Sequence, residues 1–312
     1  MKKIIGMSGA IILILASLQL RAQTFTEKIT KEFTFEKKGA DNAVLIANIN
    51  GSVKVEGYAG DKIIVEVNKS IYAKTNERLE KGKADIQLGV IDRADTLIFF
   101  VEGTGASFGR KLENRRNSNS WHHAGWGYDW CCNGNGNGNG NCNCNCRTEF
   151  DYKMDFVVKV PSSVHVVTST INEGNISVSN VSGAVVADNI NGSITLNKLV
   201  REARASTING DLDVEYVTNP TKDCRFYSLN GDINALFQRG LAANMSFESF
   251  NGSFYTNIDK LENIPVKLEK KESDKGTRYK VNGNRYKIGP GGSTFLDFET
   301  FNGNVYLKEK TN

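Results

Sequence analysis

The 312-residue chain has little proline and little histidine, and it has no long apolar run after its first twenty residues. It contains four Pro and three His, against thirty Gly. Few prolines combined with many glycines argue against Pro-rich linkers and favour strands joined by tight turns. The later sequence also lacks the roughly 20 consecutive apolar residues that a membrane-spanning helix needs.

The chain carries little net charge. The formal net charge of +4 includes Lys2, Lys3 and Arg21, and residues 1–23 contain no acidic residue, so without them the charge is +1. A nearly neutral chain without a basic stripe does not favour nucleic acid as a partner.

Residues 1–23 predict a secretory signal peptide. Two lysines precede an apolar run from Ile4 to Leu20, and the small residue Ala22 lies just before the expected cut. The alternative is an uncleaved membrane anchor, but the apolar core from Ala10 to Leu20 is short for a span. No cysteine near the cut could carry an N-terminal lipid. We therefore expect an exported protein in the periplasm, on the outer-membrane surface or secreted, without a transmembrane segment after cleavage.

One short phrase recurs along the chain: an apolar residue, Asn-Gly, a small polar residue and then alternating apolar positions. Because Asn and Gly tolerate positive φ, each phrase predicts a tight turn between strands. The turn residues are Asn50, Gly51, Gly174 (in a variant with Glu173 inserted), Asn191, Gly192, Asn209, Gly210, Asn230, Gly231, Asn251, Gly252, Asn302 and Gly303.

The spacing of the phrases predicts how they are arranged. Gly174, Gly192 and Gly210 are 18 residues apart, and the next two intervals are 21 residues. A near-constant period of this length is typical of stacked supersecondary units. Apolar residues at the second and fourth positions after Gly, such as Ile194 and Leu196, are expected to face inward. The predicted fold is all-β, an elongated β-solenoid or β-roll with Asn-Gly corners; an antiparallel β-meander or sandwich is the alternative.

The chain divides into four segments, of which the second and fourth are expected to form one domain. They are a signal peptide (1–23), an N-terminal cap with the first coil (24–102), a low-complexity insertion (103–148) and the β-repeat region with a C-terminal cap (149–312). Residues 75–84 predict a short helix or a polar loop. The last phrase, at 294–307, is expected to close the stack.

The insertion is rich in Asn, Gly, Cys and His, and its composition predicts a long disordered loop without a packed strand. Thiolate and imidazole groups together suit Zn²⁺ or Cu⁺, although Cys-Asn-Cys-Asn-Cys departs from the usual Cys-x2-Cys spacing. In an exported chain, disulfides are the alternative, and a segment without a role is the third. No other cofactor is expected. The candidate metal ligands are His122, His123, Cys131, Cys132, Cys142, Cys144 and Cys146.

The phrase at 47–57, followed by Asp61-Lys62-Ile63, resembles the opening of the bacterial putative-adhesin family DUF4097. Val160-Pro161, followed by the phrases at 170–178 and 206–212, is similar to that family as well. The resemblance covers most of residues 40–102 and 149–307. It implies an exported β-repeat protein with an adhesive or envelope role and without established catalytic residues. The insertion departs from the family's pattern.

Other residues could carry chemistry. Asp211, Asp213 and Asp232 lie beside turns, and glycan-cleaving enzymes built on β-helices need converging carboxylates, but Asp is common in turns. Cys224 is expected to be an inward strand residue and His165 an outward one. The aromatic residues of the insertion could stack on sugar rings as exposed side chains; they are Trp121, Trp126, Tyr128 and Trp130.

Taken together, the sequence predicts an exported, non-catalytic envelope protein that acts as an adhesin or scaffold by multivalent surface binding. Its partner would be a surface glycan or an envelope protein. A metal-binding or redox-responsive envelope protein that uses the Cys/His insertion is the alternative. A carbohydrate-active enzyme on a β-helix scaffold is the third hypothesis.

Overall fold

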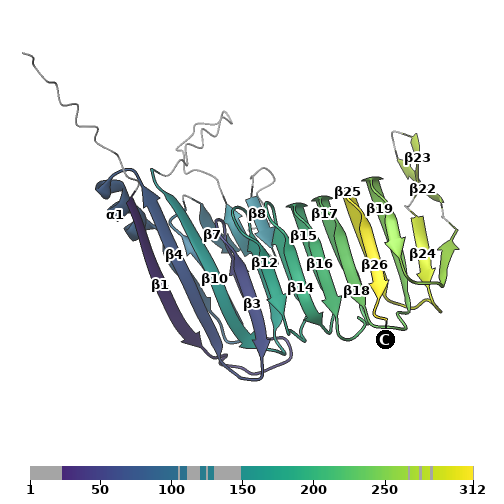
Figure 1. Cartoon of the computed structure of the whole chain (residues 1–312), viewed down its shortest axis with the longest axis horizontal. Helices are drawn as coiled ribbons and strands as arrows, with labels where there is room; N and C mark the ends of the chain where they lie inside the picture. The colour runs from purple at the N-terminus through teal and green to yellow at the C-terminus, as the bar shows by residue number, and fades with distance from the viewer. Residues whose placement is uncertain are drawn as a thin grey trace, which may run out of the picture.

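The computed structural model describes residues 23–104, 106–110, 120–123, 126–129, 149–265, 268–273, 276–281 and 284–311. These residues form an all-β structure with one helix, α1 (Asn76–Asp85). Two large mixed sheets lie against each other and give an elongated slab, with strands running across its long axis (Figure 1). Residues 1–22, which contain nearly all of the predicted signal peptide, lie outside the described residues, so that peptide stays a prediction.

The first sheet has ten strands. In spatial order they are β1 (Gln23–Phe33), β4 (Ile63–Ala73), β10 (Asp151–Pro161), β3 (Val53–Tyr58), β12 (Ile176–Ser179), β14 (Ile194–Leu199), β16 (Leu212–Tyr216), β18 (Ile233–Phe237), β26 (Val305–Glu309) and β20 (Phe254–Thr256).

The second sheet has eleven strands. In spatial order they are β21 (Leu261–Ile264), β24 (Asn284–Ile288), β19 (Ala243–Asn251), β25 (Phe295–Asn302), β17 (Cys224–Asn230), β15 (Ala203–Asn209), β13 (Val185–Asn189), β11 (His165–Thr170), β2 (Ala43–Ala47), β6 (Thr96–Glu102) and β5 (Gln87–Asp92). Two small sheets complete the structure: β22 (Leu268–Ser273) with β23 (Gly276–Val281), and β7 (Ser107–Arg110) with β9 (Trp126–Asp129) and β8 (Ser120–His123).

The repeated phrases join one sheet to the other and form no hairpins. β15 ends at Asn209 in the eleven-stranded sheet, and β16 begins at Leu212 in the ten-stranded sheet. Strands of successive phrases then pair in parallel, as β14 does with β16 and β13 with β15. The Asn-Gly dipeptide is therefore a corner between two sheets. The parallel pairing differs from the antiparallel pairing of a meander.

The core lies between the two sheets. On the ten-stranded side, the second residue after each corner Gly faces inward, and Ile176, Ile194, Leu212 and Ile233 are neighbours in register and fully buried. The fourth position is buried too, as Leu196 illustrates. The predicted inward positions are thus confirmed, because alternate side chains of a strand point to one face.

The last phrase does not close the stack, and this expectation is wrong. β25 pairs in parallel with both β17 and β19, and β26 pairs with both β18 and β20. In Figure 1 the yellow strands β25 and β26 lie between β17 and β18 on one side and β19 on the other. The chain reaches this place because β24 pairs antiparallel with the outer side of β19, which leaves the inner side for β25.

Antiparallel strands form the N-terminal end of the ten-stranded sheet. At the N-terminal end, β1, β4 and β10 pair antiparallel, and β1 forms an edge that carries Lys28, Lys31 and Glu32. Charged edge strands resist pairing with other chains.

Of the short helix and the polar loop that were expected at 75–84, the structure has the helix, α1. Its cap residue Thr75 accepts a hydrogen bond from the Arg78 amide. No helix within the described ranges has the length and apolar character to cross a membrane.

Candidate binding surface

The asparagines of the repeated phrase stack into a hydrogen-bonded ladder along one corner of the slab. From Asn172 onward, each side-chain amide donates to the amide oxygen of the Asn in the neighbouring coil, by which we mean one phrase with its two strands, at 2.8–3.2 Å. The sequence predicted these turn residues but not their mutual bonds. Along this Asn ladder the order is Asn50, Asn172, Asn191, Asn209, Asn230, Asn302 and Asn251.

Two further series of hydrogen bonds flank the Asn ladder. The residue after the corner Gly accepts a backbone N–H from the next coil, as the Asp211 carboxylate does from the Asp232 amide at 2.9 Å. The residue two positions before the Asn donates to the Gly carbonyl of the preceding coil, as the Thr207 hydroxyl does to Gly192 at 2.8 Å. Because these hydrogen bonds join neighbouring coils at each corner, they hold the outward side chains of the adjoining strands in fixed rows.

Glycine is required at these corners because the backbone of a neighbouring coil lies too close for a Cβ. A positive φ adds to this requirement at one corner only. A Cβ on Gly231 would lie closer than 3.0 Å to the Gly210 carbonyl, and one on Gly210 would meet the Gly192 carbonyl in the same way. Among the corner glycines only Gly51 has a positive φ, at 120°. The expectation that these turns use positive φ is therefore wrong for most of them.

The outer face of the eleven-stranded sheet carries an apolar row beside the Asn ladder. Its members come immediately before the ladder asparagines and change from buried to exposed along the slab: Ile49 is 7% exposed, and Phe250 is 74% exposed. We call this set the apolar row: Ile49, Ile171, Ile190, Ile208, Leu229, Phe301 and Phe250.

Part of the insertion covers the buried end of the apolar row. Tyr128 of β9 is fully buried, donates its hydroxyl proton to the Ala47 carbonyl at 2.9 Å and accepts the Val101 amide at 2.8 Å. Burial raises the pKa of Tyr128 well above its ordinary value, so the hydroxyl stays a donor. Phe108 of β7 stacks on Phe100 with ring centroids 4.3 Å apart.

The prediction that the insertion forms no packed strand is therefore wrong for β7 and β9. Tyr128 is also excluded as an exposed sugar platform, and Trp126 packs beside Phe108, with the Arg93 guanidinium 5.0 Å from its ring. The backbone of Trp121 lies in β8, and Trp130 lies outside the described residues.

The opposite end of the apolar row is open among the described residues. Phe250 and Phe301 stack with ring centroids 4.8 Å apart and an interplanar angle of 2°, and both are exposed. The same two coils carry a second stacked pair, Tyr255 with Tyr306 at 5.0 Å, on the outer face of the ten-stranded sheet. Adjacent exposed aromatic side chains of this kind are candidates for an interaction site.

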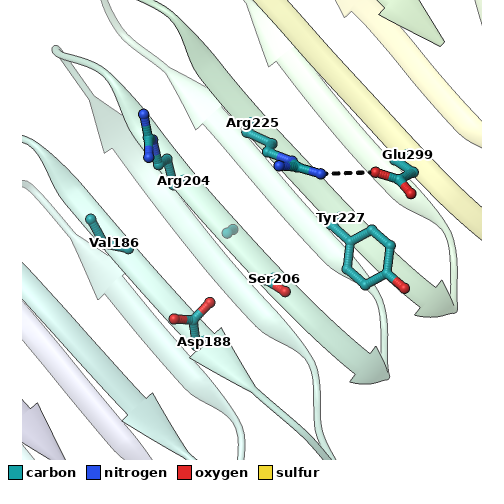
Figure 2. A pocket seen from close by; sticks show the side chains of 8 residues that line it. Val186, Asp188, Arg204, Ser206, Arg225, Tyr227 and Glu299 are labelled. Atoms are coloured by element: carbon teal, nitrogen blue, oxygen red, sulfur yellow. Dashed lines mark hydrogen bonds and ion pairs between the residues drawn. The ribbon is translucent and has the colours of Figure 1, made fainter. Parts of the chain in front are cut away.

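Next to the apolar row, the outer face of the eleven-stranded sheet is hollowed by a groove of about 500 Å³. Figure 2 shows its side chains, which come from the parallel strands β13, β15, β17 and β25. We call it the Arg204 groove; its lining is Val186, Asp188, Arg204, Ala205, Ser206, Arg225, Tyr227 and Glu299.

The charges in the Arg204 groove are unevenly paired. The Arg225 guanidinium lies 3.0 Å from the Glu299 carboxylate, a contact that Figure 2 marks. It also lies 3.4 Å from the Asp297 carboxylate, and both acidic residues are on β25. Arg204 is exposed and forms no hydrogen bond or ion pair with the residues that the structure describes. Among the described residues that line the groove, Arg204 is therefore an arginine without an ion pair.

The predicted metal ligands are not tested by the structure. His122 and His123 lie in β8, and the five cysteines of the insertion lie outside the described residues. Within the described part of the chain, no group of three His, Cys, Asp or Glu could hold a metal ion. Zinc or copper binding at the insertion stays a prediction.

The other candidate residues from the sequence form hydrogen bonds within the protein. Asp211 and Asp232 accept backbone amides of the next coil, and Asp213 accepts the Asn234 side-chain amide at 2.9 Å. Cys224 faces inward as predicted and is 2% exposed, with its sulfur 3.3 Å from the Tyr216 hydroxyl. His165 is half-buried, and its Nδ1 accepts the Ala184 amide at 2.9 Å.

Sequence reasoning missed the Arg204 groove, although its signal lay in the same register as the corners. Arg204, Arg225 and Asp297 each precede a ladder asparagine by five residues, and Ser206, Tyr227 and Glu299 precede it by three. Residues at the same offset from a stacked corner fall side by side on adjacent strands. Reading these offsets across the repeats would have placed the charged row.

Comparison with known proteins gives slight likenesses. No family model matches the chain, and no curated protein matches it. Solved structures that resemble it are a putative cell adhesion protein from Clostridium sporogenes (12% identity, TM-score 0.40, covering 92% of this chain and 100% of that one) and a putative adhesin from Bacteroides fragilis (12%, 0.33, 91% and 97%). A putative adhesin from Parabacteroides distasonis has 11% identity and a TM-score of 0.23 over 91% and 97% of the chains. Likenesses this slight do not transfer a function.

Proposed function

We propose that the protein is an exported bacterial envelope protein that acts as a non-catalytic adhesin or scaffold. In this proposal its stacked coils serve as a β-solenoid that displays repeated side chains to a surface ligand, a glycan or an envelope protein. The signal peptide predicted at 1–23 supports export, and the resemblance of the repeats to the adhesin family supports the envelope role.

One observation carries the proposal: the outward side chains of the eleven-stranded sheet stand in rows fixed by the hydrogen bonds of the corners. Neighbouring strands lie about 4.8 Å apart, so equivalent side chains recur at that pitch along the slab. A rigid row of similar groups can make several weak contacts with one extended ligand, and such contacts add through effective concentration. The open end of the apolar row, at Phe250 and Phe301, would be part of this surface.

The test compares two stacked aromatic pairs on the same coils. Beads coated with chain 24–312 at several densities are mixed with bacterial cells and applied to a glycan array. We expect adhesion to rise steeply with bead density, as multivalency requires. The variant F250S/F301S should lose most of this adhesion, whereas the matched control Y255S/Y306S, on the ten-stranded sheet, should keep it.

Equal adhesion of the two variants would overturn the assignment to the eleven-stranded sheet. Adhesion that does not depend on bead density would overturn the multivalent mechanism. Release of reducing ends from a bound polysaccharide, measured on the same preparation, would overturn the non-catalytic part and favour the carbohydrate-active enzyme.

A further inference from the structure

Arg204 is the cation of the groove that has no ion pair among the described residues, whereas Arg225 has two. Arg204 and Arg225 are direct neighbours in the register of β15 and β17, and like charges placed side by side on a sheet repel each other. Arg225 is paired with the carboxylates of Asp297 and Glu299. Both lie on β25, which is on the opposite side of β17 from Arg204. Figure 2 shows the Arg225 side chain extending toward Glu299, away from Arg204. An anion bound at Arg204 would relieve this repulsion.

Two hydroxyl groups lie beside that cation in the groove. The hydroxyls of Ser206 and Tyr227 form no side-chain hydrogen bond with the described residues, and both line the groove. Tyr227 is half-buried, and its ring stands beside Ser206 in Figure 2. An aromatic ring with a polar end suits a ligand that has both apolar faces and hydroxyl groups.

We propose that the Arg204 groove binds a carboxylated sugar residue of an acidic polysaccharide, with the carboxylate on Arg204 and the sugar ring against Tyr227. The planar guanidinium matches a carboxylate with two parallel hydrogen bonds. The hydroxyls of the sugar would bond to Ser206 and Tyr227. A groove of about 500 Å³ lies within the range of small-molecule sites.

The position of the acidic group within the groove follows from its other charges. Asp188 is in the same row as Ser206 and Tyr227, and its carboxylate disfavours a second anion there. The carboxylate of the sugar therefore lies at the Arg204 end, and the hydroxyls face Ser206 and Tyr227. This inference rests on the proposed function and names the ligand class for part of the same surface.

The test is calorimetric titration of chain 24–312 with tetragalacturonate, and with maltotetraose as the uncharged probe. We expect binding of tetragalacturonate that weakens with added salt. R204Q should weaken it about tenfold or more, since a charge-assisted hydrogen bond is worth on the order of one such factor. R204K should lose part of the affinity, because an ammonium group cannot form two parallel hydrogen bonds with a carboxylate. The matched control R239Q removes an exposed arginine from the loop after β18 and should bind as the unaltered protein does.

A second pair of variants tests the ring. Y227F should keep most of the affinity and Y227A should lose it, while unchanged urea midpoints show that all variants fold. Equal binding by R204Q and R239Q, or equal binding of both oligosaccharides, would overturn the inference. If R204Q no longer binds tetragalacturonate but beads of the unaltered protein do not adhere at all, the inference stands and the proposed function is overturned. If R204Q binds tetragalacturonate as the unaltered protein does and its beads still adhere, the inference is overturned and the proposed function stands.

Discussion

Two buried threonines of the same β-structure should respond in opposite ways to replacement by valine. Thr207 is fully buried, and its hydroxyl donates to the Gly192 carbonyl of the preceding coil at 2.8 Å. Thr168 is also fully buried, but its hydroxyl has no partner among the described residues. Valine has the same branched shape as threonine and the same preference for strands. The two substitutions therefore differ mainly in the hydrogen bond.

The expected magnitudes follow from that difference. T207V leaves the Gly192 carbonyl without its donor in a part-buried position, which should lower the free energy of unfolding by about 1–2 kcal/mol. T168V replaces an unpartnered buried hydroxyl with a methyl group, which should be neutral or raise the free energy of unfolding by up to about 2 kcal/mol.

Urea denaturation followed by circular dichroism measures both effects, provided the slope of the transition is the same for each variant. In a thermal melt each kcal/mol should appear as a shift of about 2–4 °C. If T207V is as stable as T168V, the hydrogen bonds between coils do not stabilise the corner, and the reasoning about fixed rows loses its basis.

Further outcomes follow from the corners, the chain order and one carboxylate. G231A should lower the free energy of unfolding by more than about 2 kcal/mol, because its Cβ would meet the Gly210 carbonyl, while G109A, which has open space, should be nearly neutral in the same urea assay. Deleting residues 294–312 should expose the amides of β17 and β19 to hydrogen exchange, since β25 separates these strands; protection equal to that of the full chain would contradict the observed order. Burial raises the pKa of Asp155, but hydrogen bonds from the Ser52 hydroxyl and amide, together with Lys153, outweigh it and hold that pKa below its ordinary value. The stabilisation is therefore present above about pH 4 and lost as the pH falls further, so the stability gap between the unaltered protein and D155N should narrow there; a gap that is constant down to pH 2.5 would refute this assignment.

The sequence predicted the strand repeats well because their signal is local. The alternation after each Gly placed Ile194 and Leu196 in the core. The 18- and 21-residue intervals are the separations at which strands of the ten-stranded sheet pair in parallel, as Ile176 does with Ile194 and Leu212 with Ile233. The bonds of the Asn ladder were not predictable from one phrase, because each joins residues 18 or more positions apart and depends on exact register. The Arg204 groove was missed for the same reason.

Tyr128 and the last coil show where local signals fail. The low-complexity composition of the insertion gave no sign that Tyr128 packs, because its partners Ala47 and Val101 are 81 and 27 residues away. The phrase at 294–307 looks like the others, and any parallel edge with the same corner could accept it. Its place between β17 and β19 was decided by β24, which pairs with the outer side of β19.

The sequence by itself therefore determined the element type, the inward face and the corner residues of this protein, because strand alternation and the chemistry of Asn-Gly act over a few residues. Only the tertiary structure decided the order of the coils, the burial of part of the insertion and the gathering of Arg204, Ser206 and Tyr227 around one groove. These features depend on which strands become neighbours. Where every repeat presents an almost equivalent edge, that choice is made by contacts between segments far apart in the chain.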